Sequence, residues 1–251
     1  MRTICVDAGN TFIKIALMED GDVTSLAAFP LTDAYSLLQH VASLPQVDAC
    51  ILSSVISILP KIVDVFKQKA SYFMELTHET PLPIHNLYQT PETLGKDRLA
   101  AIVGAYSLFP GKDILVFDAG TALTIDFIDS EGNFRGGNIS PGLNMRFCAL
   151  HEDTQKLPLM SQSDNYELMG STTASAIISG VQNGIIFEMN CYVHHFVNKF
   201  PTLVKILTGG DINFFVNKFK MRIFAEPNLV FIGLDNIVNF NLKKIENKLY
   251  E

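Results

Sequence analysis

The chain has 251 residues, of which 48% are hydrophobic, and it carries a formal net charge of -7. A chain of this length can bury one large core or two smaller ones, so we expect a globular protein. Its 19 lysine and arginine residues argue against a general nucleic-acid binder, because affinity for polyanions depends on neutralising phosphates.

The N-terminus runs directly into a strand-like segment and lacks the apolar region of a signal peptide. No stretch reaches the roughly 20 apolar residues that span a bilayer. We therefore expect a cytoplasmic protein that does not bind membranes. Four scattered cysteines form no C-x-x-C pair, and we interpret them as reduced thiols of the core: Cys5, Cys50, Cys148 and Cys191.

The first half of the chain begins with a predicted hairpin. A β-branched run, Thr3 to Val6, ends at Asp7-Ala8-Gly9, a second strand starts at Phe12, and Glu19-Asp20-Gly21 forms the next turn. Apolar spacing then predicts helices over residues 33–44, 58–69 and 94–108, and a buried strand over residues 49–55.

The second half repeats this opening. A run from Ile114 to Phe117 ends at Asp118-Ala119-Gly120, a second strand extends to Ile128, and a turn ends at Gly132. Both Asp-Ala-Gly phrases and both turn glycines are 111 residues apart, which indicates a duplication. Further predicted elements are a helix or helix pair over 172–200, strands over 203–208 and 229–232, and a helix over 234–248.

Each half thus predicts an α/β subdomain in which helices flank a mixed sheet. The join lies near residues 109–113, giving an N-terminal subdomain of residues 1–112 and a C-terminal subdomain of residues 113–251. A further motif lies in the second half, where two glycine-containing pairs, Gly136-Gly137 and Pro141-Gly142, flank a short segment. This segment is either a ligand-binding loop or a structural turn into a helix near residues 143–150.

The repeated turns have the chemistry of an anion site. Glycine lets backbone N–H groups approach an anion closely, and short hydroxyl and amide side chains follow it, among them Thr11 and Thr121. Asp7 and Asp118 would repel phosphate unless a cation lay between them. Two such turns facing each other across a cleft would clamp a triphosphate. Ordinary hairpin chemistry explains one such phrase alone, but not a duplicated pair.

Six ordered motifs resemble those of the type III pantothenate kinases. They are D-x-G-N-T-x-x-K at 7–14, G-x-D-R at 95–98, D-x-G-T-A-x-T-x-D at 118–126, G-G-x-I-x-P-G at 136–142, Thr173, and the turn Thr208-Gly209-Gly210-Asp211. This family lies in the superfamily of acetate and sugar kinases, Hsp70 and actin. The resemblance therefore implies two duplicated ribonuclease H-like subdomains of the actin-like ATPase type.

The resemblance also implies an activity. Members of the family are transferases that use ATP to phosphorylate pantothenate to 4'-phosphopantothenate, the first step of coenzyme A biosynthesis. They use a divalent metal such as magnesium and a monovalent cation, potassium or ammonium. They are homodimers with the substrate pocket near the subunit interface.

The motif match assigns roles to individual residues. The ATP phosphates would be held by Asp7, Ala8, Gly9, Asn10, Thr11, Phe12, Ile13, Lys14 and Thr121. Thr208, Gly209 and Gly210 would lie near the adenosine, and Asp118 would bind the monovalent cation. Pantothenate would be bound by Tyr88, Gly95, Lys96, Asp97, Arg98 and Thr173.

Asp97 is the expected catalytic base, since a carboxylate near the attacking hydroxyl orients it and accepts its proton. The alternative is structural: Asp97 caps the helix that follows or pairs with Arg98 or Lys96. Arg98 suits a substrate carboxylate, because its planar fork matches that group, but an ion pair within the protein is the alternative. Tyr88 either walls the pocket or belongs to the core.

Two other functions stay open at this point. A kinase of the same fold can act on another hydroxyl acceptor, since a fold does not fix the substrate. A non-catalytic accessory or regulatory protein is the second alternative, although the presence of Asp7, Asp97 and Asp118 argues against it.

Overall fold

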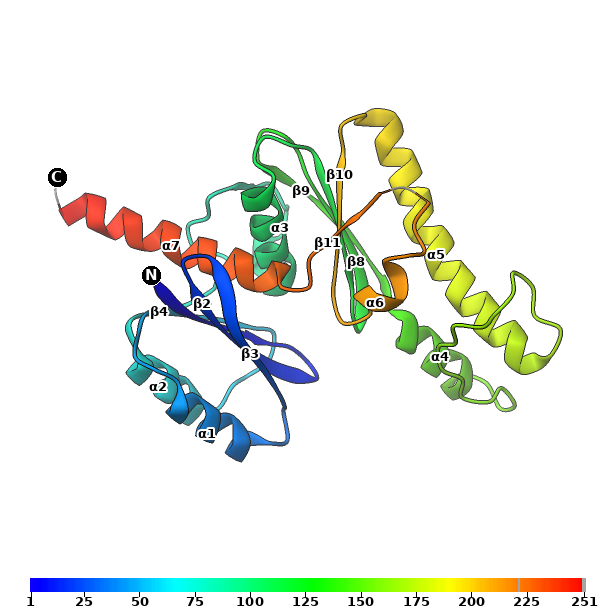
Figure 1. Ribbon diagram of the computed structural model, residues 1–251, viewed down its shortest axis with the longest axis horizontal. Coiled ribbons are helices and arrows are strands. Elements are labelled where there is room, and N and C mark those ends of the chain that lie inside the picture. The colour runs from blue at the N-terminus through cyan, green and yellow to red at the C-terminus, as the bar shows by residue number, and fades with distance from the viewer. Residues whose placement is uncertain (221, 250–251) are drawn as a thin grey trace. The chain divides into compact units, whose positions relative to one another are not determined.

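The computed structural model describes residues 1–220 and 222–249 (Figure 1). The chain divides into two compact units. The first contains residues 1–110, residues 132–134 and the segment from Asn228 onward, and the second contains residues 111–131 and 135–227. The division at residues 110/111 falls close to the predicted join. The segment from Asn228, which the sequence assigned to the C-terminal subdomain, groups with the first unit instead.

The first unit is built on a five-stranded mixed sheet of order β3-β2-β1-β4-β5. The strands are β1 (Arg2–Ala8), β2 (Phe12–Glu19), β3 (Asp22–Pro30), β4 (Val47–Ser54) and β5 (Ala70–Glu75). The central β1 runs antiparallel to β2 and parallel to β4. Figure 1 shows helices α1 (Ala34–Ser43) and α2 (Pro60–Lys69) together on one face of this sheet. Their buried Val41 and Phe66 pack with strand residues such as Ile4 in one core.

The other face of this sheet is covered by α7 (Leu229–Leu249), which lies against β1, β4 and α3 (Lys96–Leu108) (Figure 1). The predicted strand over residues 229–232 is therefore wrong, since these residues form the first turn of α7. Helices α3 and α7 approach closely, because a Cβ on Gly233 would lie 1.8 Å from the carbonyl oxygen of Ala100. That contact, together with burial of Leu229 and Phe231, favours the helix.

The second unit contains the strand order β11-β10-β7-β8-β9. The strands are β7 (Ile114–Ala119), β8 (Ala122–Ile128), β9 (Asn133–Pro141), β10 (Val204–Thr208) and β11 (Phe224–Ala225). Strand β7 is antiparallel to β8 and parallel to β10. Phe117, Phe147, Ile185 and Phe215 belong to its core, which joins the sheet to α4 (Leu143–Glu152), α5 (Thr173–Lys199) and α6 (Ile212–Phe215).

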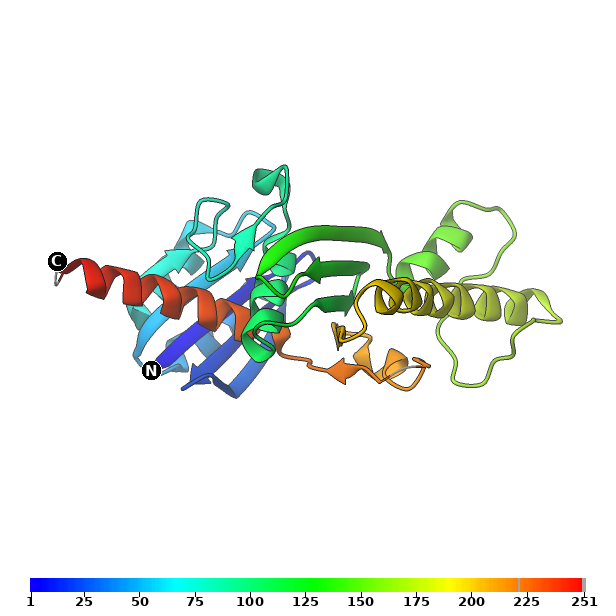
Figure 2. The same cartoon turned by 90° about the horizontal axis from the view of Figure 1, so that it is seen from above.

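Figure 2 shows α5 as one continuous helix, which decides between the predicted helix and helix pair. The segment 136–141 is not a loop, because it continues β9, and Gly142 is the N-cap of α4. The predicted entry into a helix at this motif is thus confirmed, and a contact of its backbone with a ligand stays a prediction. Cys5 and Cys50 are buried as expected, whereas Cys191 is exposed, so the interpretation of all four thiols as core residues is wrong.

The duplicated opening is confirmed in both units. Strands β1, β2 and β3 correspond to β7, β8 and β9, and the turn glycines Gly21 and Gly132 have φ angles of 93° and 79°. Only glycine adopts such angles without strain, which explains its recurrence 111 residues later. The remaining short elements are β6 (His85–Asn86), paired with Asn133 and Phe134, and the 3-10 helix η1 (Pro91–Thr93). Within the described residues, no helix is long and apolar enough to cross a membrane.

Candidate functional site

The first motif forms a tight connection between β1 and β2. The N–H of Gly9 donates to the carbonyl oxygen of Phe12 at 3.0 Å. The φ angle of Gly9 is not positive, and a Cβ there would meet only the Phe12 oxygen, at 3.6 Å. Neither backbone strain nor packing therefore requires glycine at this position. Close approach of a ligand to the backbone is the remaining physical reason for it.

Asp7 ends β1 and has an unusual electrostatic environment. Burial, together with the charge of Asp97, raises the pKa of Asp7 to about 6. Lys14, directly opposite Asp7 in the β1–β2 register, acts in the other direction and lowers this pKa. A carboxylate with raised pKa beside a second carboxylate marks a region of negative potential, which favours a bound cation.

The eight residues of the first motif, 7–14, differ in which of their groups are available to a ligand. Ala8 and Ile13 are buried in the core of the first unit, so only their backbone groups are available. The side chains of Asn10, Thr11 and Lys14 are exposed. Within β2, Ile13 is buried and Lys14 is exposed because successive strand residues point to opposite faces of the sheet, whereas Asn10 and Thr11 lie in the turn.

Asp97 lies in the first turn of α3, whose N-cap is Gly95. Its Oδ1 accepts a hydrogen bond from the N–H of Arg98 at 2.8 Å. A Cβ on Gly95 would lie 2.5 Å from the same oxygen, so this position has no room for a side chain. This hydrogen bond is the helix-terminus contact of the structural alternative, and the catalytic role of Asp97 stays a prediction.

Arg98 and Tyr88 lie together in the first unit. Arg98 is 5% exposed, and its guanidinium lies over the Tyr88 ring with its carbon 5.5 Å from the ring centroid. The Tyr88 ring also stacks on Phe134, with centroids 6.1 Å apart. This stacking fixes the orientation of both side chains. The structure therefore brings the predicted residues Asp7, Lys14, Asp97, Arg98 and Tyr88 into one unit.

In the second unit, the sheet brings two predicted motifs together. Thr208 pairs with Asp118 across β10 and β7, and the N–H of Asp211 donates to the carbonyl oxygen of Ala119 at 2.9 Å. Gly209 has a φ of 99°, and a Cβ on it would lie 2.5 Å from Oδ1 of Asp118. Glycine is thus required at position 209 by its backbone angle and by space. The Asp118 turn and the Thr208-Gly209-Gly210 turn form one surface of this unit.

Thr173 is the first residue of α5 and follows the N-cap Thr172, which forms a capping box with Ser175. It is exposed and lines a pocket of about 980 Å³ between α4 and α5. Pro141 and Arg146 line the same pocket. Thr173 belongs to the second unit, whereas the other residues expected to bind pantothenate belong to the first.

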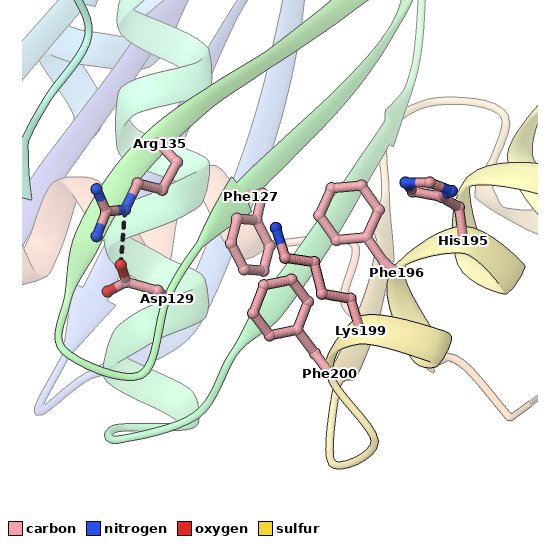
Figure 3. A pocket seen from close by; sticks show the side chains of 7 residues that line it. All are labelled: Phe127, Asp129, Arg135, His195, Phe196, Lys199 and Phe200. Atoms are coloured by element: carbon pink, nitrogen blue, oxygen red, sulfur yellow. Dashed lines mark hydrogen bonds and ion pairs between the residues drawn. The ribbon is translucent and has the colours of Figure 1, made fainter.

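A different pocket of about 520 Å³ lies near the end of β8 (Figure 3). Phe127, Phe196 and Phe200 line it, with the Asp129–Arg135 ion pair on one side and Lys199 beside the rings (Figure 3). None of its lining residues is a predicted site residue.

Asp7 and Asp97 suit a metal site in which the phosphates of the substrate and water supply most of the ligands. Among the described residues, no group of three or more His, Cys, Asp or Glu side chains could enclose a metal ion. Magnesium, however, is commonly bound through one or two carboxylates, substrate phosphates and water. Asp7, with its raised pKa and the neighbouring Asp97, fits such a partial donor set.

Solved structures with similar folds identify the fold of the chain. A protein of the Baf family of transcriptional activators from Campylobacter jejuni matches with a TM-score of 0.65 at 22% identity, covering 96% of this chain and 99% of its own. MreB5 of Spiroplasma citri bound to ADP matches with a TM-score of 0.50 at 12% identity, covering 98% of both chains. Glucokinase from an Antarctic psychrotroph also matches, with a TM-score of 0.50 at 11% identity, covering 95% of this chain and 98% of its own. These likenesses show the actin-like ATPase and sugar-kinase fold, which confirms the predicted fold class.

The sequence comparisons identify the family within this class. The family model described as type III pantothenate kinase matches residues 3–195. Relatives of that name from Phocaeicola vulgatus and Bacteroides fragilis are 42% and 43% identical over 240 and 244 residues, covering 96% of this chain and 99% of theirs. The chain belongs to the type III pantothenate kinase family.

Proposed function

We propose that the protein transfers the γ-phosphoryl group of ATP to the primary hydroxyl of pantothenate, giving 4'-phosphopantothenate for coenzyme A biosynthesis. Family membership supports the activity. The mechanism rests on one observation: the charge of Asp97 contributes to the raised pKa of Asp7. The G-x-D-R motif and the first glycine turn therefore interact within the first unit.

In this proposal, Asp97 is the catalytic base. Its carboxylate accepts a hydrogen bond from the acceptor hydroxyl, orients its oxygen for attack and takes its proton as the bond to phosphorus forms. Phosphoryl transfer depends mainly on positioning and charge stabilisation, so the orientation of the hydroxyl is the larger part of this role. The Arg98 N–H bond to Asp97 Oδ1 holds the carboxylate in place.

The two glycine turns bind phosphate. In the first unit, backbone N–H groups around Gly9 and the exposed ammonium of Lys14 stabilise phosphate oxygens. In the second unit, Thr121 contributes its hydroxyl and the turn at Thr208, Gly209 and Gly210 contacts the adenosine. Open space beside Gly9 and Gly120, where a Cβ would meet nothing closer than 3.6 Å, supports backbone contact with the ligand.

Asp7 is proposed to hold the divalent metal and Asp118 the monovalent cation. A divalent ion held there would neutralise charge on the phosphates during transfer. Asp7 would bind it in its ionised form, and the cation would then lower the pKa of this carboxyl from about 6. Potassium or ammonium at Asp118 would offset the negative charge beside the phosphate-binding turn.

Pantothenate is proposed to contact Tyr88, Gly95, Lys96, Asp97, Arg98 and Thr173. Stacking on Tyr88 orients the Arg98 side chain, whose planar guanidinium matches the geometry of the substrate carboxylate. We also propose that the protein is a homodimer that acts in the cytoplasm, where ATP is available. Exposed Met145 and the apolar groove between α4 and α5 support a subunit contact in the second unit.

The test is an assay of ADP release coupled to a second enzyme. Pantothenate is compared with a panel of hydroxy acids and sugars, and wild type is compared with Asp97→Asn. Selective turnover of pantothenate that is lost in the variant supports the proposal. Turnover of another acceptor would assign a different kinase, and absence of turnover with all acceptors would favour an accessory role.

A further inference from the structure

Arg146 on α4 and Glu188 on α5 form a polar cluster that none of the motif assignments covers. The guanidinium forms an ion pair with Glu188 Oε2. Its Nε donates to the carbonyl oxygen of Pro141 at 2.8 Å, and its Nη2 donates to Ser140 Oγ at 3.3 Å. Ser140 Oγ in turn donates to Glu188 Oε1 at 2.7 Å. One arginine therefore joins α4, α5 and the end of β9.

The cluster is partly shielded from water, since the Arg146 and Glu188 side chains are 21% and 25% exposed. Each oxygen of Glu188 accepts a bond from a different residue of the cluster. An ion pair with several hydrogen bonds in one geometry orients the groups that it joins more firmly than an isolated surface pair. Here the groups held are the hydroxyl of Ser140 and the carbonyl oxygen of Pro141.

The next residue, Gly142, connects this polar cluster to the second glycine turn at Gly120 and Thr121. The N–H of Gly142 donates to the carbonyl oxygen of Thr121 at 3.2 Å. A Cβ on Gly142 would lie 2.2 Å from the Gly120 oxygen and 2.4 Å from the Thr121 oxygen. The backbone at Gly142 is thus packed directly against the Gly120–Thr121 turn. Displacement of Pro141 and Gly142 would displace that turn.

We infer that Arg146 and Glu188 are positioning residues for phosphoryl transfer, which act on the Gly120–Thr121 turn through the backbone of Pro141 and Gly142. The inference rests on the proposed phosphate-binding role of that turn. Neither side chain need touch the nucleotide. Their effect is to hold the backbone of the turn in the geometry that receives the phosphates.

The main test compares Glu188→Gln with wild type by steady-state kinetics in which ATP and pantothenate are varied separately. Glutamine keeps the shape and removes the charge. We expect kcat/KM for ATP to fall about 10- to 100-fold, because small displacements of positioning groups have effects of this size. KM for pantothenate should change less than twofold, and Arg146→Lys should restore more activity than Arg146→Gln. The matched control is Glu152→Gln, an exposed acid at the end of α4, which should behave as wild type.

Hydrogen exchange separates positioning from a general loss of stability. Glu188→Gln should accelerate exchange in the peptide that contains Gly120 and Thr121, while peptides of β1 and β4 keep the wild-type rate. The double variant Arg146→Gln/Glu188→Gln should lose little more activity than either single variant, since both residues act through one contact.

Two outcomes would overturn the inference without contradicting the proposed function. In the first, Glu188→Gln has wild-type kinetics, whereas Thr121→Val has a raised KM for ATP. The turn would then still bind phosphate, but the Arg146–Glu188 ion pair would have no role in positioning it. The other is a raised KM for pantothenate alone in Arg146→Gln, which would make Arg146 a direct substrate contact from the α4–α5 pocket. If Thr121→Val itself leaves KM for ATP unchanged, the proposed role of the turn fails, and the inference fails with it.

Discussion

Asp7 and Asp97 are 90 residues apart in the sequence, yet the charge of Asp97 adds to the effect of burial in raising the pKa of Asp7 to about 6. Two carboxylates held near each other in the absence of a cation oppose folding. Unfavourable charge arrangements of this kind are typical of functional sites, where binding or catalysis rather than stability determines which residues are present. Predictions about catalysis, stability and cation binding follow from it.

Replacing Asp97 by Asn should lower kcat by about 10²- to 10⁴-fold, because the amide keeps the hydrogen-bonding shape but cannot accept the hydroxyl proton. KM for ATP should change much less. The measurement is steady-state kinetics of ADP release. Glu92→Gln, an exposed acid in the neighbouring 3-10 helix, is the control and should retain wild-type kinetics. An Asp97→Asn enzyme with full turnover would contradict the assignment of the base.

Replacing Asp7 by Asn should stabilise the protein at neutral pH. The pKa of Asp7 is about 6 in the folded state, above its ordinary value near 4, so the folded state retains this proton to a higher pH than the unfolded chain. Ionisation of Asp7 therefore reduces stability as pH rises from about 4 to about 6, and the penalty is fully present above that range. The variant should gain on the order of 1–3 kcal/mol at pH 8 and nothing near pH 4.

Urea denaturation of wild type and Asp7→Asn across this pH range measures the gain. Asp22→Asn, which changes an exposed carboxylate of the same sheet, serves as the control for loss of a carboxylate and should have a free energy of unfolding close to that of wild type. A gain equal at pH 4 and pH 8 would show that the titration of Asp7 is not its cause. The stabilised variant should also lose turnover, because the carboxylate that holds the metal is gone.

Replacing Gly9 by Ala should weaken nucleotide binding with little effect on folding. The structure has room for the added Cβ, whose nearest neighbour would be 3.6 Å away, and the φ angle is compatible with alanine. A methyl group would nevertheless block close approach of phosphate to the backbone. Loss of one charge-assisted hydrogen bond corresponds to a rise in KM for ATP of about 10- to 100-fold.

The matched control for this prediction is Gly184→Ala in α5, where a Cβ would also meet nothing within 4 Å. Alanine in a helix interior should add about 0.5–1 kcal/mol of stability and leave KM for ATP unchanged. If Gly9→Ala has the wild-type KM, the first turn does not bind phosphate through its backbone.

Asp118→Asn should reduce the activation by potassium. Rates are measured over a potassium chloride series at constant ionic strength, with tetramethylammonium chloride as the replacement salt. Wild type should be activated by potassium, whereas the variant should show about the same rate with and without it. A variant that keeps full activation would place the monovalent cation elsewhere.

Much of the fold could be predicted from the sequence, because the duplicated phrase fixes two equivalent hairpins and turn glycines such as Gly21 mark their ends. The run Leu229–Ile232 was misassigned since a short apolar segment fits a buried strand or a buried helix equally well. Its helical state depends on tertiary packing of Gly233 against α3, which no local pattern reports. The same limit applies to the segment from Asn228 onward, because α7 joins the first unit through tertiary contacts with α3, β1 and β4.

The candidate site, like the fold, could be predicted from the sequence only in part. Motif spacing indicated Asp7, Asp97 and Asp118 by residue type and order. The interaction of Asp7 with Asp97 and the adjacency of Asp118 to Gly209 depend on sheet register and helix placement, which the structure supplies. Arg146 and Glu188 carried no sequence signal, because an arginine and a glutamate 42 residues apart on two helices are indistinguishable from ordinary surface charges.

The most direct test is mass spectrometric detection of 4'-phosphopantothenate after incubation of the purified protein with ATP, magnesium, potassium and pantothenate. The account predicts stoichiometric formation of this product and of ADP by wild type, and at least a hundredfold slower formation by Asp97→Asn. Equal product formation by both proteins, or none by wild type with or without potassium, would contradict it.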